Sequence, residues 1–142
     1  MSKGHRSRIK RERNEIKDTR PKAHGKYLRV SDLKARMVLN QIKGKGIEEA
    51  TAILRYSPRY AADLIQKVLK SAVANAEHNM GLDPDDLYVE DAIANKGTTY
   101  GSRFRMKPRA KGRGYRIEHK YSHISIVLNE MPERMRLKKR AR

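Results

Sequence analysis

Residues 57–81 read SPRYAADLIQKVLKSAVANAEHNMG, the stretch with the most regular apolar spacing in the chain. Ser57 suits a helix N-cap, Pro58 the first helical position, and Gly81 the residue that ends a helix. We therefore predict a helix that continues to about Asn79. Its apolar residues recur every three or four positions and form one stripe, which consists of Leu64, Ile65, Val68, Leu69, Ala72, Val73 and Ala76. Because small alanines on this stripe permit close approach by neighbouring elements, the helix is expected at the centre of the domain.

Upstream of this helix, the sequence predicts one strand and two shorter helices. The strand covers residues 26–30, with Tyr27, Leu28 and Val30 as its packing residues. Ser31 offers an N-cap for the first helix, which lasts until the glycines at 44 and 46 and has apolar residues at helical spacing, namely Leu33, Val38, Leu39 and Ile42. Residues 47–56 form the second helix, because its first turn holds acids, which the helix dipole favours, and Ile53 and Leu54 face inward.

Downstream, an acidic turn precedes two predicted strands. Asp83, Pro84, Asp85 and Asp86 are turn residues, and the strands cover residues 87–95 and 115–128. In the second strand, one parity is shared by Tyr115, Ile117 and Tyr121, and the other by Ile124, Ile126 and Leu128. Either a bulge near Ser122 or His123 changes the parity, or the first half of the strand projects beyond the core and needs no apolar face.

Between these strands lies a basic segment that is expected to form the end of a hairpin arm, over about residues 95–116. If the hairpin turns near Arg105, its free part spans roughly 33 Å at strand rise, which is long beside a domain with a radius of gyration of about 13 Å. Seven cations and no acid lie between Arg103 and Arg116. With no core beneath it, such an arm repels itself and requires a partner of opposite charge.

The charge of the whole chain also predicts a polyanionic partner. The 142 residues include 34 Lys plus Arg and 16 Asp plus Glu, for a formal charge of +18. Residues 1–30, 96–120 and 131–142 hold 26 of the 34 cations, whereas residues 31–95 hold 8 cations and 10 acids. Because the basic N-terminal part offers almost no apolar stripe for a lipid surface, nucleic acid fits better than a membrane. We expect three regions: a basic extension at 1–25 that is disordered without RNA, a domain at 26–130, and a basic tail at 131–142.

Several other classes of function find little support. The chain has no cysteine, which removes disulfides and thiolate chemistry, and no apolar run long enough to span a bilayer. His119 and His123 would lie roughly 13 Å apart on a strand, too far to share a metal ion. No serine, histidine and carboxylate are arranged as a catalytic triad, so we expect neither an enzyme nor a cofactor.

Three motifs resemble one family. They are KSAVANAEHN at residues 70–79, PRAKGR at 108–113 and SHI at 122–124, and the likeness extends over about residues 26–130. The chain resembles the large-subunit ribosomal protein numbered twenty-two, in its bacterial type. This resemblance implies an α+β fold with three helices on a three-stranded antiparallel sheet, and a hairpin that enters the large-subunit RNA and lines the nascent-peptide exit tunnel. It implies a monomer in the cytoplasmic ribosome, beside other large-subunit proteins and the nascent peptide.

The cations of the arm and of residues 26–36 are the candidate RNA-binding residues: Arg103, Arg105, Lys107, Arg109, Lys111, Arg113, Arg116, Lys120, Lys26, Arg29, Lys34 and Arg36. Phe104 and Tyr115 are candidates for stacking on bases. The stretch from Thr98 to Lys107 is longer than the family pattern, so the tunnel tip is assigned to a region, which consists of Gly101, Ser102, Arg103, Phe104, Arg105, Met106, Lys107, Pro108, Arg109, Ala110 and Lys111.

Two alternatives use similar electrostatics. A DNA-architectural protein would also be strongly basic, but such proteins usually dimerise and bend duplexes. A nucleic-acid enzyme would need carboxylates or a metal near the basic surface, and the arm has only Glu118 nearby. Co-sedimentation with the large ribosomal subunit at high salt would separate the ribosomal interpretation from both.

Overall fold

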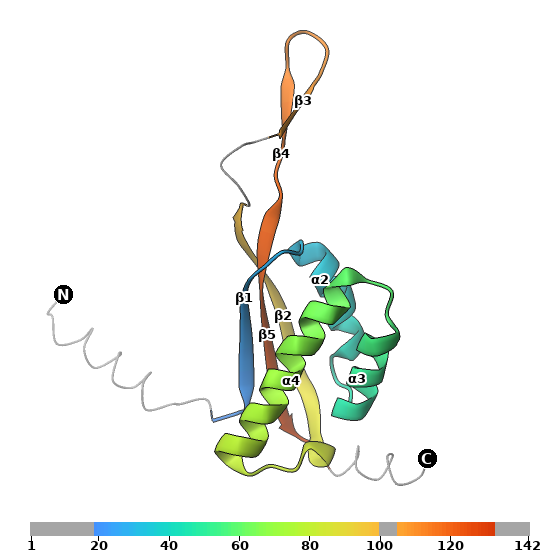
Figure 1. Cartoon of the computed structure of the whole chain (residues 1–142), viewed down its shortest axis with the longest axis vertical. Coiled ribbons are helices and arrows are strands. Elements are labelled where there is room, and N and C mark those ends of the chain that lie inside the picture. The colour runs from blue at the N-terminus through green and yellow to red at the C-terminus, as the bar shows by residue number, and fades with distance from the viewer. Residues whose placement is uncertain (1–18, 100–104, 133–142) are drawn as a thin grey trace, which may run out of the picture.

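The computed structural model describes residues 19–99 and 105–132. Figure 1 shows a domain of helices packed on a sheet, from which a narrow arm projects. The helices in this part of the chain are α2 (Asp32–Ile42), α3 (Ile47–Tyr56) and α4 (Tyr60–Met80). The strands are β1 (Lys22–Leu28), β2 (Leu87–Thr99), β3 (Arg105–Pro108), β4 (Gly114–Ile117) and β5 (Lys120–Glu130). A 3-10 turn, η1 (Pro84–Asp86), precedes β2.

The domain has two layers. Strands β1, β5 and β2 form an antiparallel sheet in that order, with β5 in the middle. The three helices lie against one face of this sheet, and β3 and β4 continue it as a two-stranded ribbon beyond the domain (Figure 1). The expected α+β fold, three helices on a three-stranded antiparallel sheet with a long hairpin arm, is therefore confirmed.

Helix α4 occupies the central position that its alanines predicted, because it contacts both other helices and both β1 and β5. Ala72 and Ala76 are fully buried, as are Ile65 and, nearly so, Leu69. The opposing side of the core comes from the sheet, where the fully buried residues are Leu87, Val89, Ile124, Ile126 and Leu128. One continuous apolar cluster therefore joins the two layers.

The end of α4 agrees with the prediction and its start does not. Gly81 ends the helix in the left-handed conformation, with φ of 65°, and the backbone N–H of Leu82 donates to the Ala76 carbonyl. The helix begins at Tyr60 with Arg59 as N-cap, two residues after the predicted start at Pro58. Ser57 instead ends α3 in an extended conformation, which the following proline favours.

Strand β1 begins at Lys22, earlier than the predicted strand at residues 26–30, so residues 22–25 belong to the domain and not to the N-terminal extension. Lys22 pairs with Val127, and Ala23 is buried against the helices. Because Ala23 and Gly25 occupy inward positions and the only large apolar residue packed on the core is Leu28 at its end, this strand lacks the alternation of large apolar residues that identifies strands in a sequence. Residues 1–18 and 133–142 lie outside the described chain.

Strand β5 has no bulge of its own. From Ser122 to Leu128, every second residue is buried under the helices without interruption. The register shifts lie in its partners: in β1 between Gly25 and Leu28, and in β2 between Lys96 and Thr99 and near Glu90. The predicted bulge near Ser122 or His123 was therefore wrong. The alternative was right, because β4 is exposed along its whole length and has no core to face.

Candidate nucleic-acid interface

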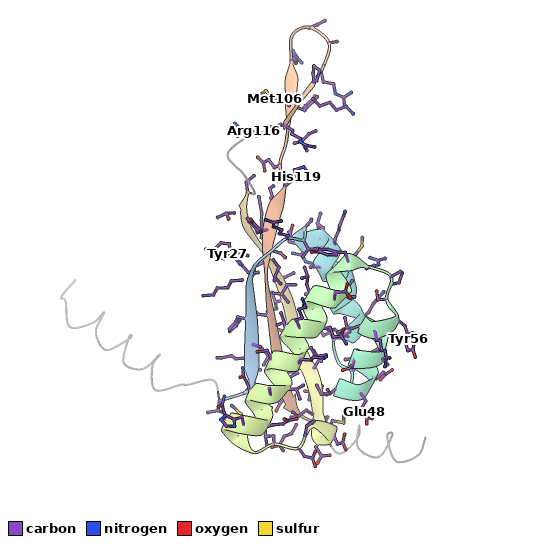
Figure 2. The ribbon with its side chains drawn as sticks, in the orientation of Figure 1. Tyr27, Glu48, Tyr56, Met106, Arg116 and His119 are labelled. Atoms are coloured by element: carbon purple, nitrogen blue, oxygen red, sulfur yellow. The ribbon has the colours of Figure 1, made fainter. Side chains whose placement is uncertain are left out.

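The arm is a two-stranded ribbon without a core. Its strands pair in the order Arg105 with Ile117, Met106 with Arg116, and Lys107 with Tyr115. Every residue of β3 and β4 is exposed. Figure 2 shows the side chains of Met106 and Arg116 on the arm well beyond the helices. Apolar burial therefore cannot hold the arm in one position relative to the domain.

The arm turns at residues 109–113. The Arg109 N–H donates to the Arg113 carbonyl at 2.8 Å, and the chain reverses through left-handed conformations at Lys111 and Gly112, with φ of 59° and 68°. The predicted tip near Arg105 was wrong, because Arg105 is paired within β3. Of the predicted tip region, residues 105–108 form that strand, residues 109–111 enter the turn, and Gly101, Ser102, Arg103 and Phe104 lie outside the described residues.

Cations occupy both faces of the ribbon and its turn. Arg105 and Lys107 share one face, because they are two residues apart on one strand, and Arg116 lies on the other, opposite Met106. Arg109, Lys111 and Arg113 surround the turn, and all six side chains are exposed. A ribbon that is positive on both faces suits a site surrounded by phosphates better than contact with one flat surface.

The aromatic residue of the described arm already has a cationic neighbour. Tyr115 is 64% exposed, and the Arg109 guanidinium lies over its ring at 5.4 Å from the centroid. This cation–π contact steadies Arg109 at the start of the turn. It also covers one face of the ring, so at most the opposite face remains for the base stacking that the sequence suggested.

The predicted domain cations gather where the arm leaves the domain. Lys26 and Arg29 flank the end of β1, and Lys34 and Arg36 lie on the first turns of α2, which begins beside that end (Figure 1). All four are exposed, and Arg36 also donates to the Ala94 carbonyl at 3.4 Å. These four residues form a basic surface beside the root of the arm, which we call the arm-side surface.

Lys120, at the start of β5, pairs with an acid. Its ammonium lies 2.8 Å from the Glu118 carboxylate. This hydrogen bond holds the pKa of the Glu118 carboxyl below its usual range and raises the pKa of the Lys120 ammonium. Both groups are therefore charged at neutral pH, and the pair as a whole adds no net charge to the surface.

The opposite end of the domain is acidic. Glu48 and Glu49 stand in the first turn of α3, and Figure 2 places Glu48 at the end of the domain away from the arm. The acids of η1 lie beside it, where Asp83 accepts from the Asp85 N–H at 3.3 Å, as expected of turn chemistry. Several acids of the domain thus lie away from the arm, where Glu49 is paired with Lys45 at 2.7 Å.

Sequence reasoning overlooked Arg59, which stands before α4. Its guanidinium lies 3.1 Å from the Met37 sulfur on α2 and extends the arm-side surface. No pattern in the sequence places Arg59 there, because the contact joins two helices whose packing the sequence does not specify.

Within residues 19–99 and 105–132, no three His, Asp or Glu side chains are grouped as metal ligands. His123 instead accepts a hydrogen bond from the Tyr27 N–H at its Nδ1, at 3.1 Å. Over the same residues, no helix combines the length and the apolarity needed to cross a bilayer.

Comparison with known proteins agrees with these features. The family model described as ribosomal protein L22p/L17e matches residues 12–129. The large ribosomal subunit protein uL22 of Lachnospira eligens is 59% identical over 130 residues, which cover 92% of this chain and 99% of that protein. The uL22 protein of Agathobacter rectalis is 55% identical over 133 residues, which cover 92% of this chain and 99% of that protein. The uL22 protein of Clostridium kluyveri is 49% identical over 109 residues, which cover 77% of this chain and 96% of that protein.

Proposed function

Because the chain belongs to the ribosomal protein L22p/L17e family, we propose that this non-enzymatic protein of the large ribosomal subunit binds the subunit RNA through its arm and arm-side surface. Its place is the cytoplasmic ribosome. The observation that carries the proposal is the arm itself, whose six described cations between Arg105 and Arg116 are exposed on both faces and at the turn. Such a surface gains little from a protein partner of mixed charge and much from closely spaced phosphates.

The position of the charge supports insertion of the arm into RNA. No acid lies on β3, on β4 or on the turn between them, and several acids of the domain lie at the far end, around Glu48 and η1. The arm is therefore the part of the described chain best suited to enter between phosphates. Once surrounded by phosphates, the arm no longer repels itself. The globular part then remains outside, where its neutral helical surface can meet neighbouring large-subunit proteins.

We further propose that the end of the arm lines the exit tunnel for the nascent peptide. The turn at residues 109–113 is narrow and is held by its own hydrogen bonds, so it can serve as a fixed piece of a wall. We expect the nascent peptide to pass beside this turn and not beside Arg105, which lies four residues before the turn, at the other end of β3.

The salt dependence of RNA binding tests the first part. Each phosphate contact contributes roughly 0.7 to 0.9 to the slope of log affinity against log salt. Replacing Arg105, Lys107 and Arg116 by glutamine should lower that slope by about 2 to 3 in the purified protein. The matched control replaces three exposed cations of α3 and α4 outside the arm-side surface, Arg55, Lys67 and Lys70, by glutamine and should lower the slope much less. Equal effects of the two variants would contradict the proposal.

The position of the turn tests the second part. In a strain whose protein has residues 109–113 replaced by two glycines, the protein should still co-sediment with the large subunit at high salt, because the arm-side surface is intact. Cryo-electron microscopy should then show a wider tunnel beside the shortened arm. An unchanged tunnel would refute the tunnel assignment, and loss of the protein from the particle would show that the turn anchors it instead.

A further inference from the structure

Three rings lie together on the helix-free face of the sheet, at the root of the arm. Ile124 and Ile126 face the helices, so the alternation of β5 places Tyr121 and His123 on the opposite face. Tyr27 of β1 joins them there, with ring centroids 6.2 Å from Tyr121 and 4.8 Å from His123, and it stands nearly perpendicular to both rings. Figure 2 shows Tyr27 on the side of the sheet away from the helices.

The backbone at Tyr27 has an unusual conformation for a bulky residue. Its φ is +53°, in the left-handed region that glycine and asparagine adopt at lower cost. The register shift between Gly25 and Leu28 creates this conformation, and the hydrogen bond from the Tyr27 N–H to His123 Nδ1 fixes it. A strained position that nevertheless holds a tyrosine points to a use for the ring.

The third strand contributes by leaving room. A Cβ on Gly97 of β2 would lie 2.9 Å from the Tyr121 carbonyl oxygen and 3.1 Å from His123 Nε2. Only glycine therefore lets β2 lie this close to the Tyr121 backbone and the His123 ring of β5. All three strands thus contribute to the ring cluster at the same height of the sheet. Strand β1 has an irregular register there, β2 has a glycine, and β5 supplies two of the rings.

The exposure and charge around the rings indicate what they bind. Tyr27 keeps 59% of its surface exposed although its neighbours hold it in place, and the exposed cations Lys26 and Arg29 lie on either side of it in the chain. The nearest acids of β2 along this face, Glu90 and Asp91, are farther down the sheet and are paired with Arg20 and Lys43, at 2.9 and 2.6 Å. A flat ring between cations suits a planar group on an anionic backbone.

We propose that Tyr27, supported by Tyr121 and His123, stacks on an unpaired base of RNA, with Lys26 and Arg29 at the adjoining phosphates. This inference rests on the proposed function and adds a contact that electrostatics does not supply. Phosphate contacts carry no preference for single strands, whereas a ring can stack only on a base that has left its helix. The site would hold the domain against RNA at the point where the arm enters it.

Binding of an oligouridine strand to the purified full chain tests the stacking. Base–aromatic stacking predicts that Tyr27→Leu weakens binding by about 5- to 150-fold without changing the slope of log affinity against log salt. Tyr27→Phe should bind as the wild type does. Tyr27→Gly relieves the backbone strain, so it should melt no lower than the wild type and yet bind as weakly as Tyr27→Leu. Tyr56→Leu, at an 83% exposed tyrosine of α3, is the matched control and should have no effect.

A strand that contains thiouridine then locates the contact by photocrosslinking and mass spectrometry. Crosslinks in the peptides that hold Tyr27 or Tyr121 support the site, and crosslinks confined to residues 105–116 overturn it. Wild-type affinity in Tyr27→Leu also overturns the site, while a steep salt slope in the same experiment leaves the proposed function standing. A wild-type slope near zero would instead reject the proposed electrostatic function, whatever the tyrosine variants do.

Discussion

Gly25 of β1 lies so close to α4 that an added methyl group has no room. A Cβ at this position would stand 2.7 Å from Val68 Cγ2 and 3.0 Å from Leu28 Cδ1, whereas ordinary contacts begin near 3.4 Å. We therefore predict that Gly25→Ala forces β1 and α4 apart and destabilises the domain.

The size of the effect follows from which neighbour can move. Leu28 can change rotamer, but Val68 is β-branched on a helix, where one χ1 rotamer is strongly preferred. The helix or strand must then shift by about 0.7 Å, the difference between 3.4 and 2.7 Å. Overpacking of this kind costs about 1 to 3 kcal/mol, and each kcal/mol lowers the melting temperature of a domain of this size by roughly 3 to 6 °C.

Thermal unfolding of the purified protein, followed by circular dichroism, measures this cost in a double-mutant cycle. Val68→Ala removes two buried carbons and should cost at least about 1.6 kcal/mol. The double variant should lose less than the sum of the single variants, by about 1 kcal/mol, because the new methyl group occupies vacated space. Gly114→Ala is the control, since its Cβ would meet only Met106 at 3.9 Å. Additive losses, or a Gly25→Ala protein that melts like the wild type, would refute the reasoning.

Three further predictions concern single positions and use the same unfolding measurement. Gly81→Ala should cost about 1 to 2 kcal/mol of folding stability, because φ is +65° at this position. Gly112→Ala, at φ +68° in the arm, should leave the melting temperature of the domain unchanged. Equal losses in the two variants would show that the arm and the domain unfold together. Ser122→Ala should stabilise by about 1 kcal/mol, because its buried hydroxyl has no hydrogen-bond partner among the described residues, and a destabilised variant would reveal one. The hydrogen bond from Lys43 lowers the pKa of Asp91, so the ion pair stabilises the fold at neutral pH and this stabilisation is lost as the pH falls through the lowered pKa. Lys43→Met should therefore reduce the loss of stability below roughly pH 4. Identical pH profiles of the variant and the wild type would count against this.

The helices could be predicted from the sequence because their signals are local. The spacing of Leu39 and Ile42 in α2, or of Ile65 and Leu69 in α4, is set by helix geometry and survives in any packing arrangement. β1 could not be predicted in full. Its inward residues are small because α4 packs against them, so the absence of large apolar residues at Ala23 is a consequence of a contact that no local pattern announces.

The candidate site divides in the same way. Charge is a property of the sequence, so the cations of the arm could be found before the fold was known. The turn was misplaced because its position depends on the backbone conformations of Lys111 and Gly112, whereas the prediction relied on segment length. The ring cluster could not be predicted at all. Tyr27 and His123 are 96 residues apart in the chain, and they meet only because the register of β1 shifts opposite β5. In a β1 without the register shift, the Tyr27 ring would not meet His123. The irregularity that makes the site unpredictable from the sequence is therefore also what forms it.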